Sequence, residues 1–231
     1  MCGRYTLRVS PAELAEIFSV LNTIDWSPRY NIAPTQTVVA VRAREQNDGR
    51  ELALFRWGLI PSWARDDKIA SSLINARAET AASKPAFRTA LKRRRCLIPV
   101  DGFYEWQAIP GQKTKQPFLI GVRDVRVFAF AGLWEHWTAA DGSERQTCTI
   151  LTTEANELMQ QVHTRMPVIL DAADYDRWLD RQRQTADEVA DLLKPFPAAR
   201  MQLTPVSTLV NSPRNDRPEC VAPLPRQGTL L

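Results

Sequence analysis

The chain has 231 residues, enough for one large domain or two small ones with a buried core. Hydrophobic residues make up 44% and charged residues 24%, which is ordinary for a soluble globular protein, and no apolar run is long enough for a transmembrane helix. The net charge of +4 permits contact with nucleic acid without demanding it, and a mildly basic enzyme has the same balance.

The N-terminus lacks the charged-then-apolar pattern of a secretory signal, because Arg8, Glu13 and Glu16 interrupt it. We therefore expect a cytoplasmic protein without membrane contact. The cysteines are far apart and form no C-x-x-C pair, so we expect free thiols and no zinc site. Two of them lie in apolar, strand-like runs that predict core positions. The four cysteines are Cys2, Cys96, Cys148 and Cys220.

The first predicted helix begins at Ser10, where Pro11 fits the first turn and Glu13 completes a capping box. Hairpin turns are predicted at Asn47-Asp48-Gly49 and at Asp141-Gly142. Further helices are predicted at 84–93, 155–162, 175–181 and, from a second capping box at Thr185, at 185 onward; strands are predicted at 37–43, 52–57, 97–100, 103–106, 118–122, 127–134, 146–152, 166–170 and 202–209.

The pattern of hairpin-linked strands with inserted helices predicts an α+β fold, a single domain whose β core is mainly antiparallel and barrel-like, with peripheral helices. No internal repeat or long linker divides the chain. We expect the domain core at about 2–210. The Pro-rich and polar segment 211–231 is expected to wrap the surface as a tail.

The N-terminus offers a specific chemistry. A small residue follows Met1, so an aminopeptidase can remove it and leave Cys2 with a free α-amine beside its thiol. The reference pKa values of these groups, about 7.7–8.0 and about 8.5, allow free amine and thiolate to coexist near neutral pH. Such a pair forms a Schiff base with an aldehyde and then closes a ring through sulfur. The alternative is an incidental N-terminal cysteine.

Two side chains are candidates for proton transfer. Glu105 stands in the aromatic segment 103–106, where an apolar setting raises a carboxyl pKa; strand alternation equally allows it to face solvent. His163 follows a predicted helix and is the better placed of the two histidines, while His136, between two tryptophans, is expected to be structural or exposed.

Several polar and aromatic residues allow both a functional and a structural interpretation. Asn75 can orient a polar intermediate and Arg77 can hold an anion, or the pair forms a helix cap and a surface ion pair. The basic run 92–95 can follow phosphates or be the solvated end of a helix. Trp63 can stack on a base or anchor its loop. No motif for a nucleotide cofactor or metal occurs, and we expect no cofactor.

Together, short segments spread over nearly the whole chain resemble the SOS response-associated peptidase (SRAP) family. Each segment is a weak signal alone, but the ordered set is highly specific. The matching segments are Met1-Cys2-Gly3-Arg4, Tyr30-Asn31-x-x-Pro34, Arg56 to Trp63, Asn75-Ala76-Arg77-x-Glu79-Thr80, Asp101 to Trp106, His163-x-Arg165-Met166-Pro167 and Val210-Asn211.

The resemblance implies a protein that recognises abasic sites in single-stranded DNA, including replication-fork junctions, and joins them covalently to Cys2 as a thiazolidine. It implies that Asn75 positions the amine and the sugar, and that Glu105 and His163 transfer protons. The residues implied to contact DNA are Arg4, Pro34, Trp63, Arg77, Trp106 and Arg165. We expect a monomer with single-stranded abasic DNA as its partner.

Two other functions stay open. A cysteine peptidase would use Cys2 as its nucleophile, either to remove Met1 from its own chain or to cleave other proteins. A non-covalent single-strand binder would bind in a salt-dependent manner, would not need Cys2 and would not prefer abasic sites.

Overall fold

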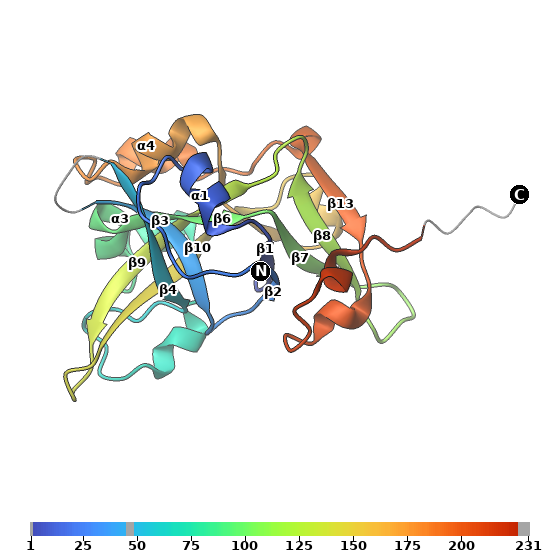
Figure 1. Ribbon diagram of the computed structural model, residues 1–231, viewed down its shortest axis with the longest axis horizontal. Coiled ribbons are helices and arrows are strands. Elements are labelled where there is room, and N and C mark those ends of the chain that lie inside the picture. Colours follow the sequence, from blue (N-terminus) through green and yellow to red (C-terminus); the bar gives the residue numbers. More distant parts are fainter. Residues whose placement is uncertain (1, 45–48, 226–231) are drawn as a thin grey trace, which may run out of the picture.

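The computed structural model describes residues 2–44 and 49–225, and Figure 1 shows the chain. Its core is a barrel of five strands in the order β10-β4-β3-β6-β9, closed by pairing between β9 and β10. The barrel strands are β3 (Thr37–Ala43), β4 (Arg50–Trp57), β6 (Arg95–Val100), β9 (Phe128–Thr138) and β10 (Glu144–Glu154).

A second, antiparallel sheet has the order β13-β8-β7-β1-β2. Its β7 follows β6 after a single residue, Asp101, which links the two sheets. Asp101 accepts hydrogen bonds from the side chain of Thr6 and from the backbone and side chain of Arg8. The strands of this sheet are β1 (Tyr5–Leu7), β2 (Arg29–Ile32), β7 (Gly102–Gln107), β8 (Gln116–Val122) and β13 (Met201–Pro205).

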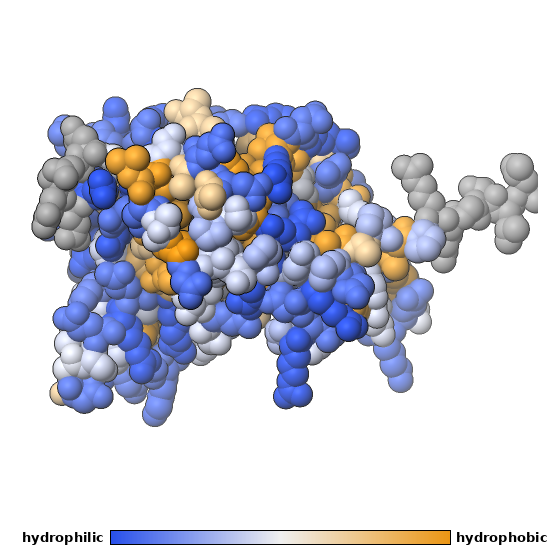
Figure 2. Space-filling view, in the orientation of Figure 1, coloured by the Kyte–Doolittle hydropathy of each residue, from blue (hydrophilic) through white to orange (hydrophobic). Residues whose placement is uncertain are grey.

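Short helices and strands complete the fold. Figure 2 shows that hydrophilic side chains dominate one face, with smaller hydrophobic areas between them. The other elements are α1 (Pro11–Ile17), η1 (Lys68–Ser72), β5 (Asn75–Arg77), α2 (Ala78–Ala81), α3 (Arg88–Arg93), η2 (Met159–Gln161), β11 (Arg165–Pro167), β12 (Ile169–Leu170), η3 (Ala172–Asp174), α4 (Tyr175–Leu179), η4 (Asp187–Leu192), η5 (Ala198–Arg200), η6 (Thr208–Asn211) and η7 (Pro218–Val221).

The predicted α+β fold with a mainly antiparallel, barrel-like core is confirmed; within the described residues, β10 pairs in parallel with β4 and β5. The predicted capping box at α1 is confirmed, since Ser10 and Glu13 exchange the expected bonds. The Asp141-Gly142 hairpin joins β9 to β10, and Gly142 has a positive φ of 82°. The other predicted hairpin includes residues 47 and 48, which lie outside the described residues.

Some boundaries were predicted wrongly. The segment 155–162 is helical only in the short turn η2, because the Asn156 side chain accepts the Met159 N–H and competes with a regular helix. The predicted strand 166–170 divides at Val168, where the chain leaves β10 and pairs with β9. Strand β13 ends at Pro205, because Ser207 caps the turn η6.

The helices at 84–93 and 185 onward are also shorter or tighter than predicted. Only Arg88–Arg93 is α-helical, and the Thr185 capping contacts precede a 3-10 helix.

Cys96 and Cys148 are fully buried, as their apolar runs predict. In the part of the chain that the structure describes, no helix is long and apolar enough to cross a membrane.

The barrel interior allows little extra volume at Gly132 on β9. A Cβ there would lie 2.9 Å from Cys96 Sγ and 2.9 Å from Ile98 Cγ1, which is closer than atoms of a packed core approach. We expect Gly132→Ala to lower the free energy of unfolding by about 1–3 kcal/mol in urea titrations, the usual cost of overpacking.

Gly121→Ala on β8 is the matched control, because the nearest atom to its added Cβ is 3.7 Å away. It should leave stability unchanged or slightly raised, since alanine has less conformational freedom to lose on folding. Equal stability of the two variants would contradict the close packing at Gly132.

Candidate functional site

Cys2 lies between the barrel and the second sheet, directly before β1. Its side chain is fully buried, and its carbonyl oxygen accepts a 2.8 Å hydrogen bond from Asn75 Nδ2. Asn75 begins β5, which pairs in parallel with β10 at Ile150. The predicted helix cap at Asn75 is therefore wrong, because Asn75 is a strand residue that fixes the backbone of Cys2.

Burial raises the pKa of the Cys2 thiol far above its ordinary value, and the negative charge of Glu105 raises it further. Glu105 lies on β7 and is only 4% exposed, so the alternative in which it faces solvent is wrong. The thiol is therefore protonated near neutral pH, with a buried carboxyl group close enough to influence its proton.

His163 follows η2 and is half-buried. Its Nδ1 accepts a 2.9 Å hydrogen bond from the backbone N–H of Arg165. A nitrogen that accepts a hydrogen bond carries no proton, so the neutral ring bears its proton on Nε2. The backbone thus sets the tautomer that can donate a proton from Nε2.

The two arginines near β5 differ in their contacts. Arg165 forms a bidentate ion pair with Glu79, at 2.7 and 2.9 Å, and also donates to the carbonyl of Thr152 at 2.6 Å. This pairing holds the pKa of the Glu79 carboxyl below its usual value. Arg77 is exposed, at the end of β5 and the start of α2.

Arg4 is held by residues from distant parts of the chain. Its guanidinium donates to Asn31 Oδ1 at 2.7 Å and to the carbonyl of Val210 at 2.8 Å, and it lies 5.6 Å from the centre of the Trp106 ring. The Trp106 indole donates to Asn211 Oδ1 at 2.7 Å. The segment after β13 therefore positions both Arg4 and Trp106.

The buried Asn31 is the centre of this network. Its Nδ2 group faces the carbonyl oxygens of Val210, Ser212 and Asn215 at 2.7 to 3.2 Å. Asp216 adds a second connection, because its carboxylate accepts the backbone N–H groups of Tyr30 and Asn31 and pairs with Arg29. These contacts attach the segment 210–216 to β2.

Pro34 and Trp63 are placed by turns at the end of β4. Pro34 is half-buried in a loop that pairs with Trp57 through the backbone of Thr35 and Gln36. Gly58 then redirects the chain with φ of 125°, and a Cβ there would lie 2.7 Å from the carbonyl oxygen of Ala70. Trp63 is 59% exposed, so it is available for contact and does not anchor its loop by burial.

The structure brings the predicted site residues together in three groups. One group is Cys2, Asn75 and Glu105; another is Arg4 with Trp106; the last is His163, Arg165 and Glu79. Arg77 adjoins the last group, because it pairs with Thr152 and its charge helps to lower the pKa of Glu79. Within the described residues, no hydrogen bond or ion pair joins the side chains of Pro34 or Trp63 to these groups. Among residues 2–44 and 49–225, no group of three or more His, Cys, Asp or Glu side chains could hold a metal ion.

A hollow of about 460 Å³ opens beside Arg4 and Trp106. Lys113 and Lys115, on the turn between β7 and β8, add positive charge to it. This turn is not among the residues that the sequence analysis predicted for the site. The signal that could have found it is its position directly after the strand that carries Glu105. The hollow is lined by Arg4, Trp106, Lys113, Thr114, Lys115 and Asn211.

Comparison with known proteins identifies the class of protein that this fold and site define. Residues 1–213 match the family described as SOS response associated peptidase (SRAP). Abasic site processing protein YoqW of Bacillus subtilis is 44% identical over 96% of this chain and 99% of its own. Abasic site processing protein HMCES of Gallus gallus is 35% identical over 86% of this chain and 67% of its own.

A crystal structure of a protein from Bacteroides thetaiotaomicron has the same fold. Its TM-score is 0.87 at 27% identity, with 96% of this chain and all of that chain covered. The chain therefore belongs to the SRAP family, and the resemblance of its motifs is confirmed.

Asn31 provides a test of the network around Arg4. We expect Asn31→Ala to lower the free energy of unfolding by about 2–4 kcal/mol, because the Arg4 guanidinium and several buried carbonyls lose their partner. Chemical denaturation measures this loss.

Asn22→Ala is the control, since Asn22 is only half-buried and bonds a single residue, Leu52, through both ends of its amide. Its loss should be about 1 kcal/mol. If both variants lost the same stability, Asn31 would not be the centre of a cooperative network.

Proposed function

We propose that this protein processes abasic sites in single-stranded DNA by joining them covalently to Cys2 after Met1 has been removed. The names of its relatives support abasic sites as the target. The observation that carries the chemistry is the environment of Cys2. Asn75 holds its backbone and Glu105 is near its buried thiol. The new α-amine would therefore form at a fixed position beside a group that can transfer protons.

The abasic sugar in its open form is an aldehyde. The Cys2 amine attacks the aldehyde carbon and, with loss of water, forms an imine. The thiol sulfur then bonds to the imine carbon while the thiol proton moves to the imine nitrogen, which gives a thiazolidine ring. No oxidant or reductant is required, because the product contains all atoms of the two reactants except one water molecule.

Because the pKa of the Cys2 thiol is raised, ring closure needs a base near the thiol, and Glu105 is the candidate. A protonated thiol is a weak nucleophile, so a nearby base must take its proton as the ring closes. We assign this step to Glu105, together with proton transfer during imine formation. His163, with its proton on Nε2, acts as a donor to the sugar oxygen. Asn75 positions the amine through the Cys2 backbone.

The cationic and aromatic residues of the site bind the DNA strand. Arg4, Arg77 and Arg165 supply positive charge to phosphates, and the exposed Arg77 presents the guanidinium fork that suits them. Pro34, Trp63 and Trp106 shape the pocket or stack on bases. Lys113 and Lys115 extend the positive hollow beside Arg4.

A peptidase acting on other proteins is disfavoured. An amine beside a thiol at a chain N-terminus is matched to an aldehyde, whereas cleavage of other proteins by a cysteine nucleophile makes no use of the amine. Removal of Met1 by the chain itself is compatible with the proposal and agrees with the family description.

The first test uses single-stranded DNA with one abasic site. The wild-type protein should form a heat-stable crosslink visible as a shifted band in denaturing gels. Cys2→Ala should form none, because alanine has no thiol and the imine at its amine cannot close to a ring. Cys148→Ala removes another fully buried thiol, from β10, and should crosslink normally. A heat-stable adduct of unchanged amount with Cys2→Ala would refute the thiazolidine.

The second test concerns proton transfer. Glu105→Gln keeps size and burial but removes the base, so the crosslinking rate should fall about 10²- to 10⁴-fold. DNA binding, measured before crosslinking begins, should change little. Glu135→Gln is the control, because Glu135 is equally buried but pairs with Arg94 on the barrel. If both variants crosslinked at the wild-type rate, Glu105 would not be the base.

A further inference from the structure

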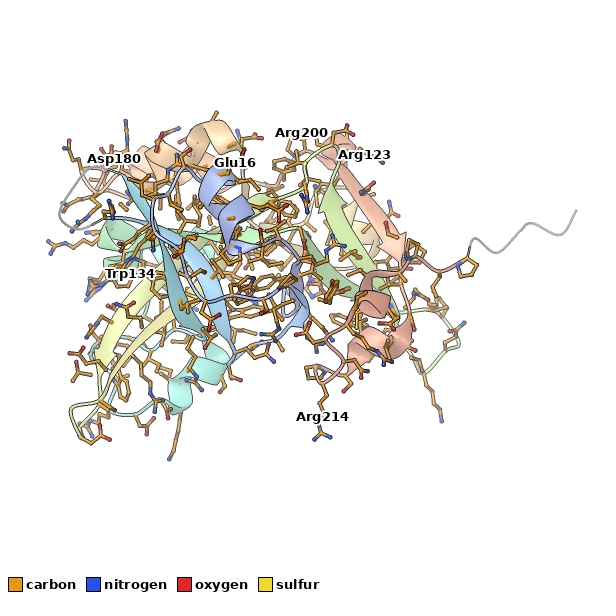
Figure 3. The ribbon with its side chains drawn as sticks, viewed as in Figure 1. Glu16, Arg123, Trp134, Asp180, Arg200 and Arg214 are labelled. Atoms are coloured by element: carbon orange, nitrogen blue, oxygen red, sulfur yellow. The ribbon has the colours of Figure 1, made fainter. Side chains whose placement is uncertain are left out.

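A second basic surface lies on α3 and on the loop that follows α4. Figure 1 shows α3 and α4 together at one end of the molecule, opposite β13. Figure 3 labels Trp134 and Asp180 at this end and Arg123 and Arg200 at the other. Between Glu79 and Asp101 the sequence has no acidic residue, and its basic residues are Lys84, Arg88, Lys92, Arg93, Arg94 and Arg95.

Three of these cations follow one another at the spacing of helical turns. Lys84, Arg88 and Lys92 are four residues apart, and the Arg88 N–H bonds the Lys84 carbonyl as α3 begins. Like charges at this spacing repel one another. All three side chains are exposed, as is Arg93, and none of the four forms an ion pair with a carboxylate in the described part of the chain.

The row ends at a cavity of about 200 Å³ whose lining includes no acidic side chain. The lining residues are Ala43, Arg93, Arg94, Arg95, Trp134, Leu179 and Arg181. The wall is therefore rich in donors, and an occupant with several acceptor oxygens would match it.

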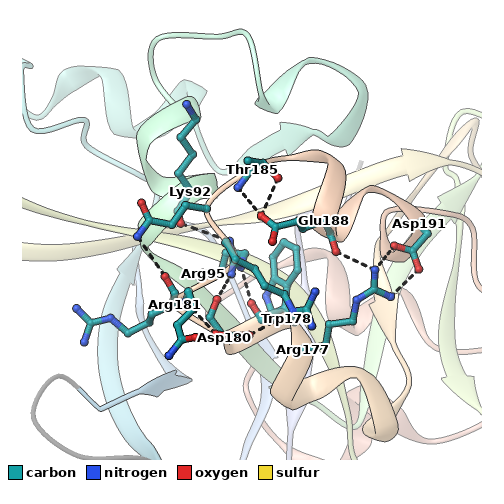
Figure 4. A network of polar contacts seen from close by, with 12 residues as sticks. Lys92, Arg95, Arg177, Trp178, Asp180, Arg181, Thr185, Glu188 and Asp191 are labelled. Carbon is teal, nitrogen blue, oxygen red and sulfur yellow. Dashed lines mark hydrogen bonds and ion pairs between the residues drawn. The ribbon is translucent and has the colours of Figure 1, made fainter.

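Arg95, which lines the cavity, is held by a network of polar contacts that Figure 4 shows. The buried guanidinium of Arg95 donates to the carbonyls of Leu91 and Arg183, each at 2.8 Å, and to those of Trp178 and Asp180. The Lys92 carbonyl is a further, longer contact at 3.4 Å. Because all of these acceptors are carbonyls, the bonds hold the cation rigidly without cancelling its charge in a direct ion pair. Arg95 therefore joins α3 to the loop after α4 and keeps the cavity positive.

Phosphate is the group that fits such a wall, since guanidinium forks match its oxygens in pairs. A single phosphate in the cavity would leave the neighbouring row of Lys84, Arg88 and Lys92 without a ligand, because these residues do not line the cavity. Arg88 and Lys92 are about 6 Å apart along the axis of α3, and Lys84 lies in the turn before it, so the row matches successive phosphates of a chain.

We propose that Lys84, Arg88, Lys92 and Arg93, named here the α3 track, bind the phosphodiester backbone of DNA outside the nucleotides held at Cys2. This inference rests on the proposed function only in taking DNA as the partner. The α3 track adds length-dependent affinity and takes no part in the chemistry at Cys2.

The test compares two charge reversals in the track with one at the far end. Arg88→Glu and Arg93→Glu are matched by Arg123→Glu, which is also exposed and changes the net charge equally. Binding of an undamaged single strand of about 40 nucleotides is measured between about 50 and 200 mM salt. Each track variant should bind about 3- to 10-fold more weakly and lose about 0.7 from the salt slope per phosphate contact. Arg123→Glu should change neither quantity by as much.

A short abasic oligonucleotide of about seven nucleotides separates this inference from the proposed function. Track variants that fold as judged by thermal melting should crosslink it at the wild-type rate. Wild-type protein that fails to crosslink would refute the proposed function and leave the binding measurement on undamaged DNA valid.

Three results would overturn the α3 track. Equal losses for Arg93→Glu and Arg123→Glu would show only the effect of net charge. If crosslinking of the short oligonucleotide fell as much as binding of the long strand, the effect of the variants would lie at Cys2 or in folding. Stabilisation of the wild type by inorganic pyrophosphate, abolished in Arg93→Glu while long DNA still binds normally, would assign the cavity to a free phosphorylated compound.

Discussion

The pairing of β10 with its neighbours is the constraint on which both the barrel and the site depend. This strand closes the barrel against β9, and it also pairs with β4, β5 and β11. Its parallel register with β5 brings Asn75 to Cys2, and its antiparallel register with β11 brings Arg165 to Glu79. A slip of one residue in the pairing of β5 or β11 with β10 would turn Asn75 or Arg165 to the opposite face and separate the site.

The position of Cys2 combines two opposing requirements. Full burial keeps its backbone in one place and excludes water, but the same burial raises the pKa of the thiol. In the proposed reaction the buried Glu105 carboxyl compensates for this raised thiol pKa, because it is assigned to take the thiol proton as the ring closes. The scaffold around Arg4 is similarly fixed, because Asn31 and the Val210 carbonyl hold its guanidinium in one orientation without a ligand.

Local sequence signals predicted much of the fold. The capping box at Ser10, the β-rich runs of the barrel and the Asp141-Gly142 hairpin depend on neighbours a few residues apart, and the structure contains them. The predicted helix at 155–162 failed because a single side chain, Asn156, took a backbone N–H that the helix needed. Propensity over a window cannot detect such a local competitor.

The sequence allowed the types of residue in the candidate site to be predicted, but not the long-range contacts that hold them in place. Cys2 and Glu105 have recognisable chemistry, and the family motifs directed attention to Asn75 and His163. The importance of Asn31 depends on contacts with residues 179 to 184 positions away, and no spacing in the sequence predicts them. The burial of Glu105 likewise depends on how the second sheet packs on the barrel, because alternation along β7 allowed either face.

The attachment of the segment 210–216 to Arg4 has a consequence for the order of events during synthesis. Cys2 leaves the ribosome first, but its partners Asn75 and Glu105 follow much later, and the carbonyl that holds Arg4 comes from Val210. A nascent chain therefore exposes its N-terminal residues during most of translation. A separate aminopeptidase has this interval in which to act on Met1, before the last contacts form and enclose Cys2.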